Sequence, residues 1–307
     1  MNRSVFNIHA YAKLTISTLL SFGLAACGGS SSETSNPPPT SPYPIGHCNF
    51  CDFRKECEAH WLVEDHLSLI AQIRREQVMR LHGAGIASVA ALAAASADEL
   101  DVRIGSRTLG NLIAQARLQD EARRTGQHRY ELLPPEDERG FRLMPAPSAG
   151  DLFFDMEGYP YFEAARGLEY LFGVVHQDDG GAKFTAFRAR TREEERLAFE
   201  GFIDFVWARL VADPQLHVYH YSGYETTAVR RLAQEHSTRI EEVDELLRRE
   251  VFVDLYRVVR QTLRISHDGY GLKKVRTFFM PEAGHGTVTD GAESIVEFDR
   301  WLRTGDA

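Results

Sequence analysis

Two carboxylates separated by one residue are the most chemically suggestive feature of the sequence. Asp155 and Glu157 lie at the end of a short apolar run that starts at Leu152. Residues two apart in a β-strand point to the same face, so both carboxylates are expected to project together from the end of a buried strand. Like charges at such a position are costly unless a cation lies between them. The spacing therefore predicts a site for Mg²⁺ or Mn²⁺, although Asp-x-Glu alone is common and also fits two solvated acids.

A third acid occupies a comparable position further along the chain. The apolar segment 216–221 predicts a strand, Ser222-Gly223-Tyr224 follows it, and Glu225 begins a predicted helix that reaches residue 235. Two divalent ions roughly 4 Å apart can activate a water and stabilise the leaving oxygen in phosphodiester hydrolysis. We therefore expect Asp155, Glu157 and Glu225 to be both catalytic and metal-binding. His220 and Tyr221 could line a substrate groove or could be ordinary strand residues.

The elements expected around these acids define a fold class. Strands are predicted at 152–156, 170–176, 184–188 and 216–221, and helices at 193–211 and 225–235; an apolar triplet at 251–253 leads into a helix that reaches residue 263. Three strands followed by alternating helices and strands is the order of an α/β, RNase H-like mixed sheet with flanking helices.

A small helical region is predicted before this sheet. From about residue 67 to 124 apolar residues recur at helical spacing, and the segments 81–86 and 104–109 each contain a glycine turn that leads into a helix. Such tandem units resemble a helix-hairpin-helix domain, whose backbone N–H groups bind DNA phosphates without reading sequence. A plain helical spacer fits equally well. The arginines expected to serve DNA binding are Arg103, Arg107, Arg117, Arg123 and Arg124.

The four cysteines all lie in the first fifth of the chain. Cys48, Cys51 and Cys57 bring three soft ligands close together, and Cys27 is the fourth cysteine. An iron–sulfur cluster, a zinc site completed by His47 or His60, and three unliganded thiols remain open as interpretations. The absence of cysteine beyond residue 57 argues against a disulfide framework and favours a reducing compartment.

The first 42 residues differ from the rest. An apolar run at 14–26, too short to span a membrane, follows Arg3 and Lys13 and ends at Cys27, which resembles the lipid-accepting cysteine of a bacterial lipoprotein signal. Residues 28–42 are rich in Gly, Ser, Thr and Pro and predict a flexible linker. Taken literally, this segment predicts a membrane-anchored lipoprotein without a stable membrane span.

The chain from residue 43 to 307 resembles RecB-like nucleases that carry a C-terminal YprB-type, RNase H-like domain of the DEDD 3′–5′ exonuclease class. The matching segments are Tyr43–Cys48, Asp65–Leu67, Phe154–Gly158, Tyr219–Glu225 and Glu293–Phe298. The resemblance implies a cysteine-cluster tail at 43–66, the helical domain at 67–130 and the exonuclease domain at 148–307. It also implies a cytoplasmic enzyme of DNA repair or processing that cuts DNA or RNA, with a helicase as a candidate partner.

Three departures from that family bear on function. The RecB-like core is missing, so the fourth ligand of a [4Fe–4S] cluster is missing too, and a gene fusion or assembly artefact is suspected near residue 42. Most members have Asp where this chain has Glu225. The family's fourth acid is expected after Ala307; His285 and Asp290 have a matching spacing, but Gly and Pro around them predict a loop. We therefore expect an exonuclease fragment with impaired catalysis.

A non-catalytic nucleic-acid-binding module is the main alternative, and a surface lipoprotein is the third. The net charge of −9 argues against a chain that coats nucleic acid through bulk attraction, but it leaves room for a local basic groove.

Overall fold

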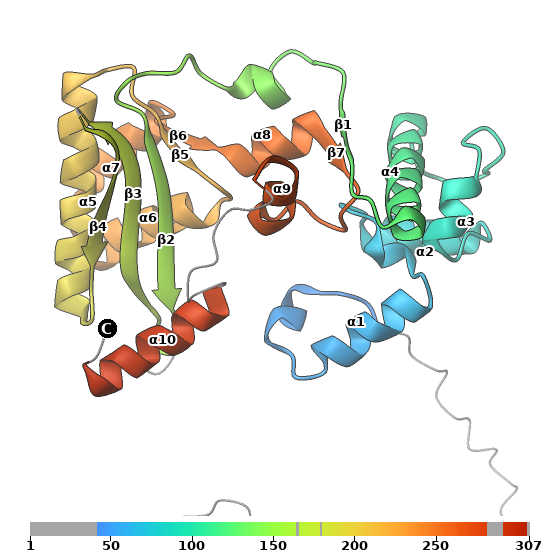
Figure 1. Ribbon diagram of the computed structural model, residues 1–307, viewed down its shortest axis with the longest axis horizontal. Helices are drawn as coiled ribbons and strands as arrows, with labels where there is room; N and C mark the ends of the chain where they lie inside the picture. Colours follow the sequence, from blue (N-terminus) through green and yellow to red (C-terminus); the bar gives the residue numbers. More distant parts are fainter. Residues whose placement is uncertain (1–41, 164–165, 179, 281–290, 306–307) are drawn as a thin grey trace, which may run out of the picture. The chain divides into compact units, whose positions relative to one another are not determined.

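The computed structural model describes residues 42–163, 166–178, 180–280 and 291–305 (Figure 1). The chain divides into two units, residues 1–42 and residues 43–307. Cys27 and the lipoprotein-like signal lie outside the described residues, so their prediction stands untested. In the part that is described, no helix combines the length and the apolar character needed to cross a membrane.

The second unit begins with a group of helices that share a core. They are η1 (Gly46–Phe50), α1 (Arg54–Val63), η2 (Leu67–Leu69), α2 (Arg75–Gly83), α3 (Val89–Ala94) and α4 (Ser106–Thr125). Leu67, Leu81 and Leu92 are fully enclosed in this core. Ser88 begins α3 because its hydroxyl accepts the N–H of Ala91 at 3.1 Å, which satisfies one of the free donors of the first turn.

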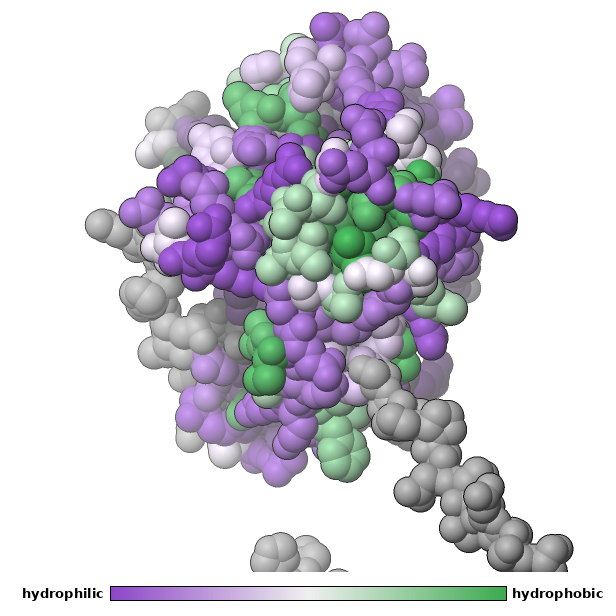
Figure 2. Space-filling view, turned by 90° about the vertical axis from the view of Figure 1, so that its right-hand side faces the viewer, coloured by the Kyte–Doolittle hydropathy of each residue, from purple (hydrophilic) through white to green (hydrophobic). Residues whose placement is uncertain are grey.

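One of the two expected glycine-turn units forms between helices. Gly85, at φ 84°, lies in the turn from α2 to α3. The second turn does start a helix, since α4 follows Gly105 directly, but residues 95–105 before it form no α-helix. The face that carries α2, α3 and α4 shows an apolar area surrounded by hydrophilic side chains (Figure 2). The helix-hairpin-helix interpretation therefore stays a prediction.

A two-stranded antiparallel sheet joins these helices to the C-terminal part. It pairs β1 (Tyr130–Leu132) with β7 (Leu263–Ile265). Gln115 of α4 donates a hydrogen bond of 2.7 Å to the carbonyl of Ile265, and Ala71 packs with Ile265 and Tyr270 in a shared apolar cluster. A short helix, η3 (Gly140–Leu143), lies in the proline-rich segment that follows β1.

The larger sheet has five strands in the order β4-β3-β2-β5-β6. Its strands are β2 (Leu152–Tyr159), β3 (Leu168–Asp178), β4 (Gly181–Arg188), β5 (Val218–His220) and β6 (Phe252–Asp254). The associated helices are α5 (Arg192–Ala212), α6 (Tyr224–Glu235), α7 (Ile240–Arg248), α8 (Leu255–Thr262), α9 (Leu272–Phe279) and α10 (Gly291–Thr304). The pairs β2–β3 and β3–β4 are antiparallel, whereas β2–β5 and β5–β6 are parallel. This mixed α/β sheet confirms the predicted RNase H-like fold class.

The alternation of side chains along β2 determines what each face presents. Leu152, Phe154 and Met156 are buried in the core that the sheet shares with α5, α6 and α7. Phe154 stacks on Phe202 of α5 with ring centroids 4.2 Å apart. The alternate positions point to the opposite face, which leaves Asp155 exposed.

Candidate active site

The β2 strand places Asp155 and Glu157 on its open face. Asp155 is exposed, whereas Glu157 is half-buried. Gly173 of β3 lies opposite Asp155 in the antiparallel register, so no side chain from that position covers the carboxylate. The register shifts between Glu157 and Gly158. Such bulges are frequent beside active sites, where they redirect a side chain.

The electrostatics of this pair match the repulsion expected from the sequence. Although Asp155 keeps contact with solvent, partial burial raises the pKa of its carboxyl group, and the nearby Glu225 raises it further. Burial also raises the pKa of Glu157; Asp155 adds to this shift, and Lys273 of α9 opposes it. Within the described residues neither Asp155 nor Glu157 forms an ion pair. Among the described residues, Lys273 is thus the positive charge that acts on Glu157, and no cation lowers the pKa of Asp155.

Glu225 reaches the site from the neighbouring parallel strand. Strands β2 and β5 run side by side in the same direction, so their carboxyl ends meet at one edge of the sheet. Glu225 is the second residue of α6, which begins directly after β5 and its short turn. Its side chain is only 5% exposed, and the ring Nδ1 of His220 lies 3.3 Å from Glu225 Oε2. The buried contact with His220 fixes the carboxylate close to Asp155.

Asp155, Glu157 and Glu225 lie near one another, but their carboxylates are not arranged around a common metal position. In the described ranges, no group of three or more His, Cys, Asp or Glu side chains is arranged to hold a metal ion. Mutual repulsion accounts for this arrangement, because carboxylates converge closely only when a cation offsets their charge. Their chemistry still fits a hard divalent cation, which prefers carboxylate oxygen. The metal-binding and catalytic roles of Asp155, Glu157 and Glu225 thus stay predictions.

Sequence reasoning missed a fourth acid beside this group. Glu169 of β3 is buried, accepts a hydrogen bond from the Tyr224 hydroxyl at 2.8 Å and pairs with Arg231. It is also close enough to raise the pKa of Glu157. A Cβ at Gly158 would lie 2.5 Å from Glu169 Oε2, so only glycine allows this approach. The signal in the sequence was a charged residue inside an otherwise apolar strand.

Other acids near the sheet edge have different roles. Asp254 Oδ1 accepts the N–H groups of Tyr256 at 2.9 Å and Ser222 at 3.1 Å, so Asp254 is the N-cap of α8. Ser222 lies in the turn that leads to Glu225, and its backbone has φ 120°, an angle that residues other than glycine rarely adopt. The hydrogen bond from its N–H to Asp254 holds it there. His285 and Asp290 lie outside the described residues.

The cysteine cluster does not assemble into a metal site. Cys48, Cys51 and Cys57 are free and half-buried, and they are not grouped as ligands within the described chain. Cys48 Sγ accepts the N–H of Ile45 at 3.3 Å, while Cys57 belongs to α1. His60, offered as a zinc ligand, pairs with Glu64 at 3.1 Å instead, and His47 is exposed. The iron–sulfur and zinc interpretations therefore stay predictions, without a grouped ligand set in the described part of the chain to support them.

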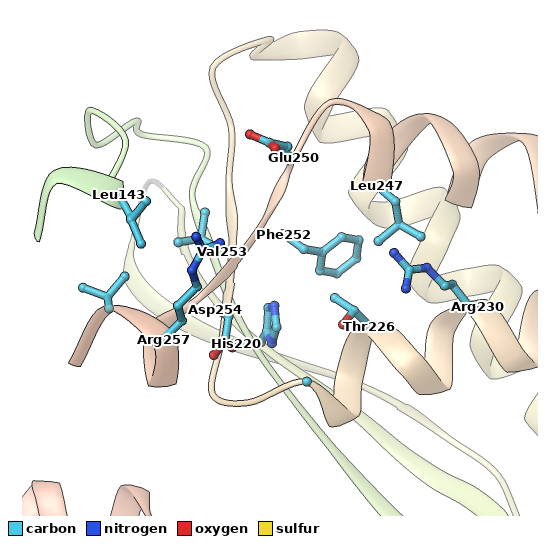
Figure 3. Close-up of a pocket in the computed structure, with 12 residues that line it drawn as sticks. Leu143, His220, Thr226, Arg230, Leu247, Glu250, Phe252, Val253, Asp254 and Arg257 are labelled. Carbon is cyan, nitrogen blue, oxygen red and sulfur yellow. The ribbon is translucent and has the colours of Figure 1, made fainter. Parts of the chain in front are cut away.

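A cavity of about 320 Å³ is lined by residues of β6, α6 and α8 (Figure 3). His220 lines it, with Thr226 and Arg230 from α6 and Arg257 from α8. Asp155 and Glu157 are not among its lining residues. His220, whose ring lies 3.3 Å from Glu225 Oε2, therefore borders both this cavity and the candidate site.

A mixed sheet with acids at the ends of two adjacent parallel strands is the architecture of an RNase H-like nuclease. The family model of the RNase_H superfamily matches residues 152–307, half of the chain. The protein therefore belongs to the RNase H superfamily, and this membership suggests nuclease-type phosphodiester hydrolysis. Comparison with curated proteins and with solved structures gives no match.

Proposed function

We propose that this protein is a nuclease that hydrolyses phosphodiester bonds of DNA with the aid of Mg²⁺ or Mn²⁺. Asp155, Glu157 and Glu225 would hold the metal. The observation that carries the proposal is the meeting of Asp155 with Glu225 at the carboxyl ends of β2 and β5, in a superfamily domain of nuclease type. The raised pKa values of Asp155 and Glu157 support it, because a cation would offset their repulsion.

Each residue has a part in this proposal. A bound divalent cation would supply charge neutralisation and water activation at the scissile phosphate. Asp155 and Glu157 present carboxylate oxygens on the open face of the sheet, where a substrate can approach. His220 orients Glu225 from behind, as outer partners orient metal ligands in proteins. Lys273 carries positive charge close to Glu157, where it can attract a phosphate.

The finer assignments follow from the order of motifs. We propose membership of the RecB-like group with a YprB-type domain, 3′–5′ polarity, a role in DNA repair or processing, and a cytoplasmic location. A helicase partner belongs to the same proposal. These assignments rest on resemblance, whereas the metal-site proposal rests on the geometry of β2, β5 and α6.

A cleavage assay tests the proposal. The full chain is incubated with a single-stranded oligonucleotide labelled at its 5′ end, in Mg²⁺, Mn²⁺ or EDTA. We expect shortening of the oligonucleotide in either metal, none in EDTA, and none with Asp155→Asn. Asp204→Asn is the matched control. Asp204 lies on α5 and forms its ion pair with Arg239, outside the group of acids on β2. Equal cleavage by wild-type and Asp155→Asn protein would refute the assignment of Asp155.

The alternative is a nucleic-acid-binding module without catalysis. One observation favours it: the three acids stand close without a finished ligand arrangement. If the chain binds an oligonucleotide but leaves it intact in both metals, this alternative holds.

A further inference from the structure

A second cavity, of about 540 Å³, lies where α4, α8 and the β1–β7 sheet come together. In Figure 1 the strands β1 and β7 run between α4 and α8. We call it the arginine groove, because five arginines line it: Arg74, Arg107, Arg139, Arg260 and Arg264. Such a concentration is unexpected in a chain whose net charge is −9. This local concentration of positive charge indicates a binding site for an anionic ligand.

The acids near this groove do not neutralise it. Glu136 is the one acidic residue in its lining, and it is shared by Arg107 and Arg139. Glu131 of β1 pairs with Arg264 at 2.6 Å. Five guanidinium groups therefore face two carboxylates. A concave surface with one sign of charge in excess concentrates ligands of the opposite sign.

Arg74 and Arg260 are the cations most available to a ligand. Both are exposed, and within the described residues neither forms an ion pair. The backbone N–H of Arg74 donates to Gln77 Oε1 at 2.8 Å, and the Arg260 guanidinium lies over the ring of Tyr256. Guanidinium groups present a planar fork of donors that matches the oxygens of a phosphate.

The chain connects the arginine groove to the carboxylates of β2. Tyr270 lines the groove, and its carbonyl accepts the Tyr221 hydroxyl at 2.6 Å, just after β5. Three residues later, Lys273 lowers the pKa of Glu157. The segment that borders the groove at Tyr270 therefore also brings the positive charge of Lys273 to the candidate active site.

We propose that the arginine groove binds the phosphates of a single nucleic-acid strand and leads that strand to the carboxylates of β2. This inference rests on the proposed nuclease function. A cavity of this volume accepts a ligand of drug-like size, equivalent to roughly one or two nucleotides of a strand. Its polar lining suits backbone binding without sequence preference, which is how proteins track a single strand.

Binding without cleavage tests the inference separately from the nuclease activity. The full chain is titrated into a fluorescent 12-nucleotide single strand in EDTA, with anisotropy as the readout, over a series of salt concentrations. Replacing Arg74 and Arg260 by Gln should raise Kd at least about tenfold, and it should reduce the salt dependence of log Kd by about 2, one for each lost phosphate contact. The matched control replaces Arg248 and Arg249, two exposed arginines of α7 that share Glu245.

The titration and the crosslinking each give results that support or overturn the assignment of the arginine groove. Weaker binding by the groove variant alone supports the proposal. No binding by wild-type protein at low salt, or equal weakening by the control, overturns it. Competition by poly-glutamate as strong as by the unlabelled strand identifies an acidic peptide as the occupant and also overturns it. Photo-crosslinking of wild-type protein to a 4-thiothymidine strand should label peptides from 72–77, 107–115 and 260–270, and the absence of label from all three segments would contradict the groove. Binding without metal-dependent cleavage would refute the nuclease proposal and leave the groove intact.

Discussion

Replacing Asp155 by Asn should stabilise the protein in the absence of divalent cations. Partial burial and Glu225 raise the pKa of Asp155, so the folded state holds this proton more tightly than the unfolded chain does. Ionising Asp155 therefore costs stability. The cost is absent below the unfolded pKa and fully present above the folded pKa. At neutral pH the Asn variant avoids this cost and should have the higher free energy of unfolding. As the pH falls, this difference in stability should shrink through the folded pKa and vanish below the unfolded pKa.

The size of the effect follows from the exposure of the site. Relief of unfavourable charge commonly contributes about 0.5–2 kcal/mol. Because Asp155 is exposed and screened by solvent, we expect about 0.5–1 kcal/mol. In a domain of about 150–250 residues this corresponds to a rise of about 1–4 °C in Tm. A cation at about 100 times its Kd stabilises a folded protein by about 2.7 kcal/mol, so wild-type protein should overtake the variant when Mn²⁺ is added.

Thermal unfolding followed by circular dichroism measures this crossing. The variant should melt higher in EDTA, and the wild type should melt higher in Mn²⁺. Asp204→Asn is the control: Arg239 lowers the pKa of Asp204, so its loss should lower Tm slightly or leave it unchanged, with no effect on the Mn²⁺ response. A wild type that is more stable than Asp155→Asn in EDTA would refute the reasoning, as would an equal Mn²⁺ response in the two proteins.

Three further substitutions separate the roles of neighbouring residues. Glu225→Gln preserves the shape of the side chain beside His220 and should reduce the cleavage rate by at least about 100-fold with little change in Tm; a rate near wild type would exclude Glu225 as a ligand. Gly158→Ala places a Cβ 2.5 Å from Glu169 Oε2 and should cost about 1–3 kcal/mol in denaturant unfolding, together with activity; unchanged stability would show that Glu169 moves freely. Asp254→Ala removes the N-cap of α8 and should cost about 0.5–2 kcal/mol, while Mn²⁺ affinity measured by calorimetry stays constant; a lost Mn²⁺ site would make Asp254 a ligand.

The elements that the sequence predicts well are those with strong local patterns. Strand β2 is an apolar run that ends in two acids one residue apart, and α5 follows the N-cap Thr191, whose hydroxyl accepts the N–H of Glu194. Both signals are contained within a few residues, so neighbours along the chain are enough to interpret them. The same holds for Asp155 and Glu157, whose shared face follows from strand geometry alone.

The remaining features depend on contacts between distant segments. The pairing of Tyr130 with Ile265 crosses much of the chain, and neither three-residue strand carries a pattern long enough to predict it. In the sequence, Glu169 is a charged residue in an apolar strand without an evident partner. Its partners Tyr224 and Arg231 lie more than 50 residues further along the chain, so only the fold brings them together. The arginine groove likewise gathers residues from four separate segments, so its charge is invisible in any one of them. The cysteine spacing leaves the choice between a cluster and free thiols open, because local spacing cannot show whether a fourth ligand completes the set.

The central claim is that the acids at the ends of β2 and β5 bind a divalent cation, and titration with Mn²⁺ followed by electron paramagnetic resonance tests it most directly. The free Mn²⁺ signal should fall on addition of wild-type protein and of Asp204→Asn, with saturation at one or two ions per chain, as two-metal phosphodiester chemistry allows. It should persist with Asp155→Asn and Glu225→Gln, and Mn²⁺ should bind more weakly as the pH falls, because the raised pKa values of Asp155 and Glu157 favour protonation. A wild-type protein that leaves the signal unchanged, or variants that quench it equally, would contradict the account.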